Sequence, residues 1–365
     1  MKAVFSLFVM FFCTLSSFFP ETEKGFTLTG NVSGFSDGTQ LYLEDVTSGM
    51  GQMMDSTQVQ NGQFQFKGQL PEGVRKVWVR TKDFSDYKAF WLENSVIQFQ
   101  AQKGKFRQAE IKGSATHSSE SQLYASLTPY DKKIDSLGNL RQKDTSKVQR
   151  NLLKQQINQL EEQKKQQLVS FIQNNPNSIL SIYQMNTWAT TWGRELSTKL
   201  YASLSPVLKN TPYGQNVGAY IALNQDIKIG GPFVDFSQEN LQGQKVKLSD
   251  YRGKIVLLDF WAAWCGPCRA DNPKLVAIYQ EFHEKGFEVL GVSLDTRKEH
   301  LEEAVIKDKL PWMNVSDYNG DKNRVALIYG VTGIPDNFLI DKNGNIVARG
   351  LRGEKLKEKL KTMLP

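Results

Sequence analysis

Two cysteines separated by two residues are the strongest chemical signal in this chain. Cys265 and Cys268 stand in the stretch WAAWCGPCRAD, and the whole chain has three cysteines. A C-x-x-C pair can form part of a zinc site, attach a haem, act as a structural disulfide or exchange electrons as a dithiol. The surrounding residues distinguish these chemistries.

Three of the four fit the chain poorly. Structural zinc usually needs four ligands, but there is no second cysteine pair and the three histidines are scattered. Haem attachment requires C-x-x-C-H, and Arg269 occupies the histidine position. A disulfide that closes so short a loop removes little chain entropy, so a purely structural role would stabilise the fold little. The remaining interpretation is reversible dithiol–disulfide exchange.

The local pattern supports a redox pair. The apolar run KIVLLDFWA predicts a buried strand before the cysteines, and a helical pattern follows them. Cys265 is therefore expected at a helix N-terminus, where free amides and the helix dipole stabilise a thiolate. We expect Cys265 to be the exposed nucleophile, and Cys268, one turn later, to be shielded and to resolve the mixed disulfide. Pro267 suits the first helical turn, and with Gly266 it is expected to influence the reduction potential.

The pattern around the pair predicts an α/β fold with a mixed sheet. FEVLGVSL reads as a second buried strand, HLEEAVIKDKL as a helix, GIPDNFLID and GNIVARG as a strand–turn–strand pair, and EKLKEKLKTML as a final helix. Strands that alternate with helices and end in a hairpin build a layered α/β domain. This domain is predicted over residues 227–365.

The remainder of the chain predicts a multidomain protein. Residues 25–114 contain short strands of alternating polarity between turn residues, which indicates a sandwich-like antiparallel β domain, whose role the pattern does not reveal. Residues 115–226 are predicted to be helical. Within them, apolar residues recur at intervals of three or four positions, at Leu153, Ile157 and Leu160 and again at Leu168, Phe171 and Ile172. This amphipathic helix is expected to stop near Pro176.

The N-terminus predicts export. Residues 1–20 carry one lysine and then a largely apolar run, followed by the polar stretch ETEK, which is the order of a secretory signal peptide. The run is short for a membrane span, which needs about 20 apolar residues. We therefore expect a location in the periplasm or cell envelope, with a membrane tether as the open alternative. Whether the leader is cleaved is not indicated, and Phe12 before Cys13 does not fit a lipidation signal.

Charge and composition indicate an ordinary soluble surface for the rest of the chain. The net charge is +7 and 23% of residues are charged. The charge is spread out, without the basic runs and interleaved aromatics that bind nucleic acid, so no nucleic-acid partner is expected. A homo-oligomer is neither indicated nor excluded.

The residues around the cysteines also carry a family resemblance. WAAWCGPC at a strand–helix junction, with a later Ile-Pro pair before a strand, resembles the thioredoxin family. The segment GPFVDFSQENLQGQKVKLSDYRGK resembles the extension found in secreted thiol–disulfide oxidoreductases of the TlpA/ResA type, which are related to AhpC/TSA proteins. The similarity covers about residues 227–365. The order of β domain, helical segment and thioredoxin-like domain resembles exported proteins of Bacteroidetes.

The resemblance implies roles for individual residues. Cys265 matches the attacking cysteine, Cys268 the resolving cysteine, and Trp264 the aromatic residue beside them. Ile334 and Pro335 match a cis-proline turn that faces the disulfide and offers its backbone to an extended substrate. Together with Gly266 and Pro267, these residues are expected to contact the substrate.

Two carboxylates are candidates for the proton acceptor of Cys268. Asp259 matches the buried acid of thioredoxin, and Asp271 lies where ResA-like proteins carry a buried glutamate. The sequence leaves the choice open, and Asp271 has the alternative of being a solvated acid in the first helical turn.

One position departs from the thioredoxin pattern. Asp336 follows Pro335 where thioredoxins usually have threonine. A carboxylate there is expected to repel acidic substrates and to raise the pKa of Cys265. This departure puts partner choice and redox potential in doubt, while the chemistry stays the same.

The sequence thus predicts an exported thiol–disulfide oxidoreductase without a cofactor or metal. It is expected to reduce disulfide-bearing exported proteins and to take electrons from a membrane thiol donor. A peroxiredoxin-like peroxidase is one alternative, although the residues before Cys265, DFWAAW, lack the usual peroxidatic context. A redox-sensitive binding module is the other alternative.

Overall fold

The computed structural model describes residues 25–47, 51–71 and 73–364. The predicted leader, residues 1–20, lies outside the described residues. Within the described part of the chain, no helix combines the length and the apolar character needed to cross a bilayer. The chain divides into two compact units, one ending at Ser126 and one beginning at Leu127.

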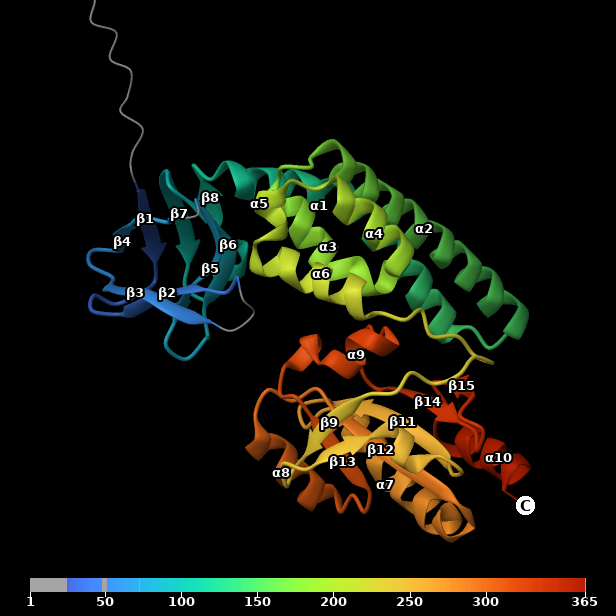
Figure 1. Cartoon of the computed structure of the whole chain (residues 1–365). Helices are drawn as coiled ribbons and strands as arrows, with labels where there is room; N and C mark the ends of the chain where they lie inside the picture. Colours follow the sequence, from blue (N-terminus) through green and yellow to red (C-terminus); the bar gives the residue numbers. More distant parts are fainter. Residues whose placement is uncertain (1–24, 48–50, 72, 365) are drawn as a thin grey trace, which may run out of the picture. The chain divides into compact units, whose positions relative to one another are not determined.

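The first unit is a β-sandwich built from two four-stranded sheets (Figure 1). One sheet has the order β4-β1-β7-β8 and the other the order β3-β2-β5-β6. Apolar residues of both sheets meet in one core that includes Leu28, Phe66, Val77 and Phe99. The strands are β1 (Phe26–Ser33), β2 (Gln40–Asp45), β3 (Gln52–Gln58), β4 (Gln63–Gly68), β5 (Val74–Thr81), β6 (Tyr87–Glu93), β7 (Val96–Gln102) and β8 (Glu110–Lys112), with a short 3-10 helix, η1 (Phe106–Gln108), before β8.

The predicted β domain is confirmed, with two differences in detail. The β1–β7 pair is parallel, whereas the other paired strands are antiparallel. Alternating polarity reports which face of a strand is buried but not the direction of its neighbour, so the sequence pattern could not reveal this pair. The third strand lies a few residues earlier than the stretch STQVQ, which the pattern had favoured.

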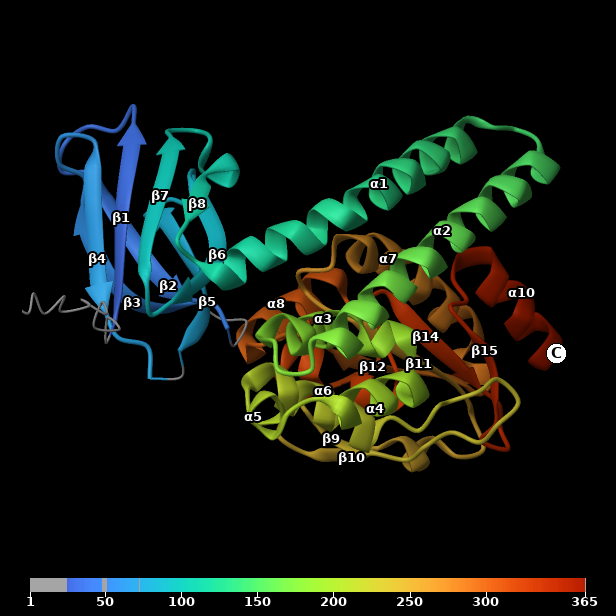
Figure 2. The same ribbon diagram turned by 90° about the horizontal axis from the view of Figure 1, so that it is seen from above.

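The helical segment follows as predicted, and it contains more helices than the sequence pattern showed. The helices are α1 (Ala115–Lys143), α2 (Lys147–Asn174), α3 (Ile179–Trp192), α4 (Arg194–Ser203), α5 (Pro206–Lys209) and α6 (Pro212–Leu223). The side chains of Ser146 and Ser178 cap α2 and α3 by accepting backbone N–H bonds. The long helices α1 and α2 run side by side (Figures 1 and 2), and Lys164 bonds Asp131 between them at 2.5 Å.

The C-terminal region is the predicted thioredoxin-like α/β domain. Its seven-stranded mixed sheet has the order β10-β9-β13-β12-β11-β14-β15. Its elements are β9 (Ser237–Asn240), β10 (Lys245–Lys247), η2 (Leu248–Tyr251), β11 (Ile255–Trp261), α7 (Gly266–Phe282), η3 (His283–Lys285), β12 (Phe287–Ser293), α8 (Lys298–Asp308), β13 (Met313–Ser316), η4 (Gly320–Lys322), α9 (Arg324–Tyr329), β14 (Asp336–Ile340), β15 (Ile346–Arg349) and α10 (Gly353–Met363).

The position of β11 explains its apolar sequence. It is a central strand, parallel to β12 and antiparallel to β14, and every one of its residues is buried. Helices α7 and α10 cover one face of the sheet and α9 the other (Figure 1). A strand covered on both faces needs apolar residues at successive positions, which is why Asp259 stands out as the one acid in β11.

The helical segment is joined to the thioredoxin-like domain through α6 and α9. The Asn224 side chain donates a hydrogen bond to the Leu327 carbonyl at 3.2 Å, and the Gln225 amide donates one to the Ile328 carbonyl at 3.2 Å. Leu223 packs against the core of the domain. Asn224 and Gln225, which follow α6, are therefore held against α9 of the thioredoxin-like domain.

Candidate active site

The cysteine pair lies at the junction of β11 and α7, as the sequence predicts. Cys265 is the residue preceding the first turn of α7, and Gly266, Pro267 and Cys268 form that turn. The two cysteines are joined in a disulfide bond. The Cys268 amide donates a hydrogen bond to Cys265 Sγ at 3.2 Å. The helix thus directs a backbone donor at the sulfur on which a thiolate would form.

One expectation about this pair is wrong for the disulfide form. Cys265 is only 4% exposed, close to the 2% of Cys268, although the sequence predicts an exposed nucleophile. The sulfur of Cys265 is covered because it is bonded to that of Cys268 and contacts the amide of the first turn. Trp264, immediately before the pair, is 61% exposed, so an apolar surface lies directly beside the disulfide.

Residues that the sequence reasoning missed hold the loop before Cys265. The Ala263 amide donates a hydrogen bond to Asp295 Oδ2 at 2.9 Å. The Ala263 carbonyl accepts one from Arg269 Nη1 at 3.1 Å, and Arg269 also forms an ion pair with Asp308 on α8. The peptide groups of Ala263 are therefore held from two sides. No sequence signal links these acids to the loop, because they reach it only through the packing of α8 and the end of β12.

The peptide bond between Ile334 and Pro335 is cis, as expected. In the antiparallel register of β11 and β14, Asp336 pairs with Phe260. Pro335 therefore lies beside the end of β11, where the chain leaves the sheet toward Cys265. This arrangement places the proline turn at the same edge of the sheet as the disulfide.

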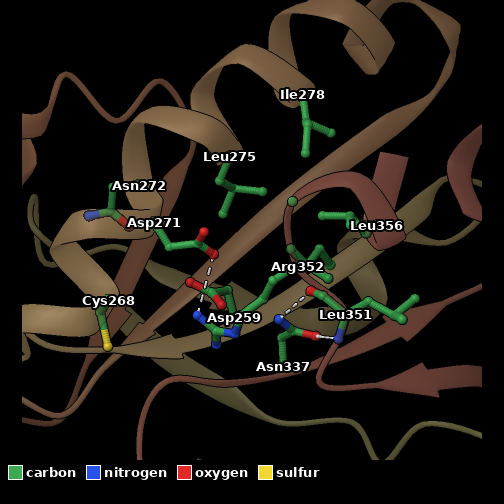
Figure 3. A pocket seen from close by; sticks show the side chains of 12 residues that line it. Asp259, Cys268, Asp271, Asn272, Leu275, Ile278, Asn337, Leu351, Arg352 and Leu356 are labelled. Atoms are coloured by element: carbon green, nitrogen blue, oxygen red, sulfur yellow. Dashed lines mark hydrogen bonds and ion pairs between the residues drawn. The ribbon is translucent and has the colours of Figure 1, made fainter. Parts of the chain in front are cut away.

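A cavity behind the disulfide collects the two candidate acids and a cation. Cys268, Asp259, Asp271 and Arg352 line it (Figure 3). The remaining lining residues are Leu257, Asn272, Leu275, Ile278, Asn337, Leu351, Gly353 and Leu356. Most of this second group is apolar, so the buried carboxyl group of Asp259 is poorly solvated and responds strongly to nearby charges.

The environment of Asp259 favours the protonated form of its carboxyl group. It is 7% exposed, and burial raises its pKa from 3.8 to about 7. Arg352 opposes this rise, whereas the charges of Asp271 and Asp336 add to it. A carboxyl group with a pKa near 7 can accept and return a proton at neutral pH, as a proton acceptor for Cys268 must.

Asp271 has a different environment. It is partly buried, and its Oδ2 accepts a hydrogen bond from Arg352 Nη1 at 3.5 Å. Its side chain is 24% exposed and also lines the cavity, so it is in contact with both solvent and the buried group of residues. Arg352 and Asn337 are further residues that sequence reasoning missed. Arg352 follows β15 and Asn337 is the second residue of β14, so both are distant from the cysteines along the chain.

Asp336, whose carboxylate is expected to repel acidic substrates, has a basic partner in the structure. Arg349 Nη2 lies 2.6 Å from Asp336 Oδ2, and Arg349 Nε contacts both carboxylate oxygens. The same guanidinium donates to the Gly330 carbonyl and lies over the ring of Phe338. Arg349 therefore offsets the carboxylate next to the proline turn, so repulsion of acidic substrates is weaker than the sequence alone suggests.

This ion pair leads to a prediction about substrate charge. Arg349→Met is expected to slow the reaction with acidic oxidised glutathione about two- to fivefold relative to neutral hydroxyethyl disulfide, because the charge of Asp336 is then uncompensated. The ratio of the two initial rates at low ionic strength measures the effect. Lys342→Met, an exposed lysine in the β14–β15 turn, is the matched control. An unchanged ratio in Arg349→Met would show that the pair does not influence incoming substrates.

Comparisons with known proteins match the β domain and the thioredoxin-like domain. The AhpC/TSA family model matches residues 229–349, and a domain of unknown function (DUF4369) matches residues 26–119. Thiol-disulfide oxidoreductase ResA of Bacillus cereus (strain ATCC 10987 / NRS 248) is 32% identical over 145 residues, which are 40% of this chain and 82% of that protein. ResA of Geobacillus thermodenitrificans (strain NG80-2) is 33% identical over 142 residues, 38% of this chain and 80% of that protein.

A similar solved structure is the thioredoxin domain of a thiol-disulfide oxidoreductase from Bacteroides vulgatus. It is 36% identical, covers 38% of this chain and 99% of its own, and superposes with a TM-score of 0.36.

Proposed function

Because the chain belongs to the TlpA/ResA-type family of thioredoxin-like thiol–disulfide oxidoreductases, we propose that it reduces disulfide bonds of exported proteins through Cys265 and Cys268. The observation that carries this proposal is the disulfide between these residues at the N-terminus of α7. A dithiol that closes reversibly there can transfer two electrons to a substrate.

The first step uses Cys265 as the nucleophile. In the reduced protein, the Cys265 thiolate attacks one sulfur of the substrate disulfide. A mixed disulfide forms, the substrate S–S bond breaks, and the other substrate sulfur leaves as a thiolate that takes a proton from solvent. The helix N-terminus supports this step because its amides and dipole favour the anionic sulfur.

The second step uses Cys268 and its proton acceptor. The Cys268 thiol gives its proton to Asp259, and the resulting thiolate attacks Cys265 Sγ. The Cys265–Cys268 disulfide forms while the bond from Cys265 to the substrate breaks. The second substrate sulfur leaves as a thiolate that takes a proton from solvent, and Asp259 returns the proton it accepted to solvent. The protein dithiol has then lost two electrons and the substrate has gained them. The pKa of about 7 at Asp259 supports its assignment to this role, because the group is poised to exchange a proton at neutral pH.

A reducing direction predicts a low reduction potential. The Gly266-Pro267 pair between the cysteines is typical of reducing thioredoxins. We therefore expect a potential nearer to the ~−270 mV of thioredoxin than to the ~−120 mV of the oxidant DsbA. Equilibration with glutathione redox buffers, read by alkylation of free thiols, measures it. A potential as high as that of DsbA would contradict the reductase direction.

The cellular setting is part of the same proposal. The leader-like residues 1–20 support export to the periplasm or cell envelope, where disulfides persist. A reductase outside the cytoplasm needs a dithiol donor to reopen its own disulfide, and a membrane thiol carrier has the required chemistry. Trapping with Cys268→Ser in cells, followed by identification of the captured proteins, tests both the substrates and the location.

A turnover assay tests the activity itself. The protein is expected to reduce a disulfide-bonded protein substrate when dithiothreitol supplies electrons, at a rate above that of dithiothreitol alone. Hydrogen peroxide supplied in place of the disulfide distinguishes the peroxidase alternative. Faster consumption of peroxide than of disulfide would contradict this proposal and indicate a peroxidase. Activity toward neither substrate would favour a redox-sensitive binding module.

A further inference from the structure

The cavity behind the disulfide contains a cation that the two-acid description of the site leaves unexplained. The Arg352 side chain enters the cavity from the segment between β15 and α10 (Figure 3). Its Nη1 bonds Asp271 at 3.5 Å. Its Nη2 is buried and meets no hydrogen-bond acceptor among the described residues. Burying a guanidinium nitrogen without a hydrogen-bond acceptor costs free energy. The negatively charged groups around Arg352 must therefore explain why it lies here.

The backbone before Arg352 is held in place by Asn337. The Asn337 side chain donates to the Leu351 carbonyl at 2.9 Å and accepts from the Leu351 amide at 3.0 Å. The Gly350 amide donates to the Asn337 carbonyl at 2.9 Å. Because Asn337 is the direct neighbour of Asp259 in the β11–β14 register, the residue beside the acid also fixes the segment that carries the arginine.

The other neighbours of Asp259 supply no positive charge. On β12 the paired residue is Gly291, which has no side chain, and on β14 it is the neutral Asn337. Helix α7 contributes Cys268 and Asp271 to the cavity, and Asp336 at the start of β14 adds negative potential. Among the described residues that line the cavity, Arg352 is the one cation. Figure 3 shows the carboxylates of Asp259 and Asp271 both directed toward its guanidinium.

We propose that Arg352 is a positioning residue for the proton transfer that activates Cys268. One of its nitrogens donates a hydrogen bond to Asp271 and so holds the carboxylate of that residue in place. Its second nitrogen faces the cavity as a donor for the negative charge that develops when Asp259 is ionised. The two acids thereby take different parts, with Asp259 exchanging the proton and Asp271 fixing the arginine. This inference rests on the proposed function, because it concerns the resolving step of that reaction.

The cation makes proton acceptance possible at neutral pH. Without it, Asp259 would face Asp271, Asp336 and an apolar wall, and its pKa would rise further above 7. The acid would then be protonated at neutral pH and could not take the proton of Cys268. Cys265 lies on the other side of the disulfide and depends on the helix N-terminus, so its own attack should be insensitive to Arg352.

Stopped-flow mixing of the reduced protein with 5,5′-dithiobis(2-nitrobenzoate) separates the two steps. The first release of coloured thiolate reports the attack by Cys265, and the second, which does not depend on reagent concentration, reports the attack by Cys268. For Arg352→Met we expect an unchanged first phase and a second phase about tenfold slower at pH 7. We also expect the midpoint of its pH profile to rise by at least about one unit, which corresponds to a tenfold change.

Matched variants identify the cause. Arg352→Lys keeps the charge and should restore the second phase to within about threefold of the wild-type protein, while Lys355→Met, which removes an exposed charge on α10, should change neither phase. In an Asp259→Asn background, Arg352→Met should slow the second phase by less than about twofold, because its target is already gone. Thermal unfolding of each variant shows whether the fold is retained.

The outcomes separate this inference from the proposed function. A wild-type protein without a second phase would overturn both. A normal second phase in wild-type protein with an unshifted pH profile in Arg352→Met would overturn the role of Arg352 alone. An equal loss in the presence and absence of Asp259 would do the same, since the arginine would then act by another route.

Discussion

Cys265→Ser is expected to lower disulfide-reductase turnover by at least about a thousandfold, because the attacking sulfur is replaced by a hydroxyl that does not ionise at neutral pH. Cys268→Ser should be equally deficient in turnover for a different reason. Its Cys265 still attacks the substrate, but no second sulfur releases the product, so a mixed disulfide accumulates.

The two variants are distinguished by what they capture. Non-reducing gels after incubation with a disulfide-bonded protein should show an adduct for Cys268→Ser and none for Cys265→Ser. The double variant, with serine at both positions, is the matched control and should capture nothing. An adduct formed by Cys265→Ser would reverse the assigned roles of the two sulfurs, and full turnover in either variant would exclude a mechanism that depends on the pair.

The second large effect concerns stability and pH. Because Asp259 has a pKa of about 7 in the folded protein and 3.8 as a reference, the folded state holds the proton more tightly than the unfolded state. Its contribution to stability is fully present below pH ~4 and is lost as the pH rises toward 7. Three pKa units at 1.36 kcal/mol each set the loss at about 4 kcal/mol as an upper limit.

Comparison with Asp259→Asn isolates this contribution. The neutral amide does not titrate, so we expect this variant to gain stability relative to the wild-type protein as the pH rises from 4 to 8, and the difference to level off above that. Urea unfolding of both oxidised proteins across this range gives the two curves, whose difference cancels the other titrating groups. A constant difference over the whole range would show that Asp259 ionises normally, and the proton role assigned to it would then lose its physical basis.

Several features of the site could be predicted from the sequence because they are local. The apolar strand, the C-x-x-C pair and the helical pattern after it are consecutive, so their junction follows from short-range rules. The cis peptide at Ile334–Pro335 likewise matches a short motif. Asp259 was a candidate because its position matches the buried acid of thioredoxin, and its place in an otherwise apolar strand favoured that role. The short strands β9, β10 and β13 and the six-residue helix α9 were missed, because so few residues show no clear periodicity.

The sequence by itself predicted a cysteine pair at a strand–helix junction, within a thioredoxin-like domain that follows a β domain and a helical segment, and the structure has this layout. Only the tertiary structure brought together the charged residues that surround this pair. Arg352, Asn337 and Asp271 meet Asp259 because two strands and two helices pack around one cavity, and Arg349 offsets Asp336 because β15 lies beside β14. Electrostatic interactions depend on distance and burial, and neither quantity is contained in the spacing of residues along a chain.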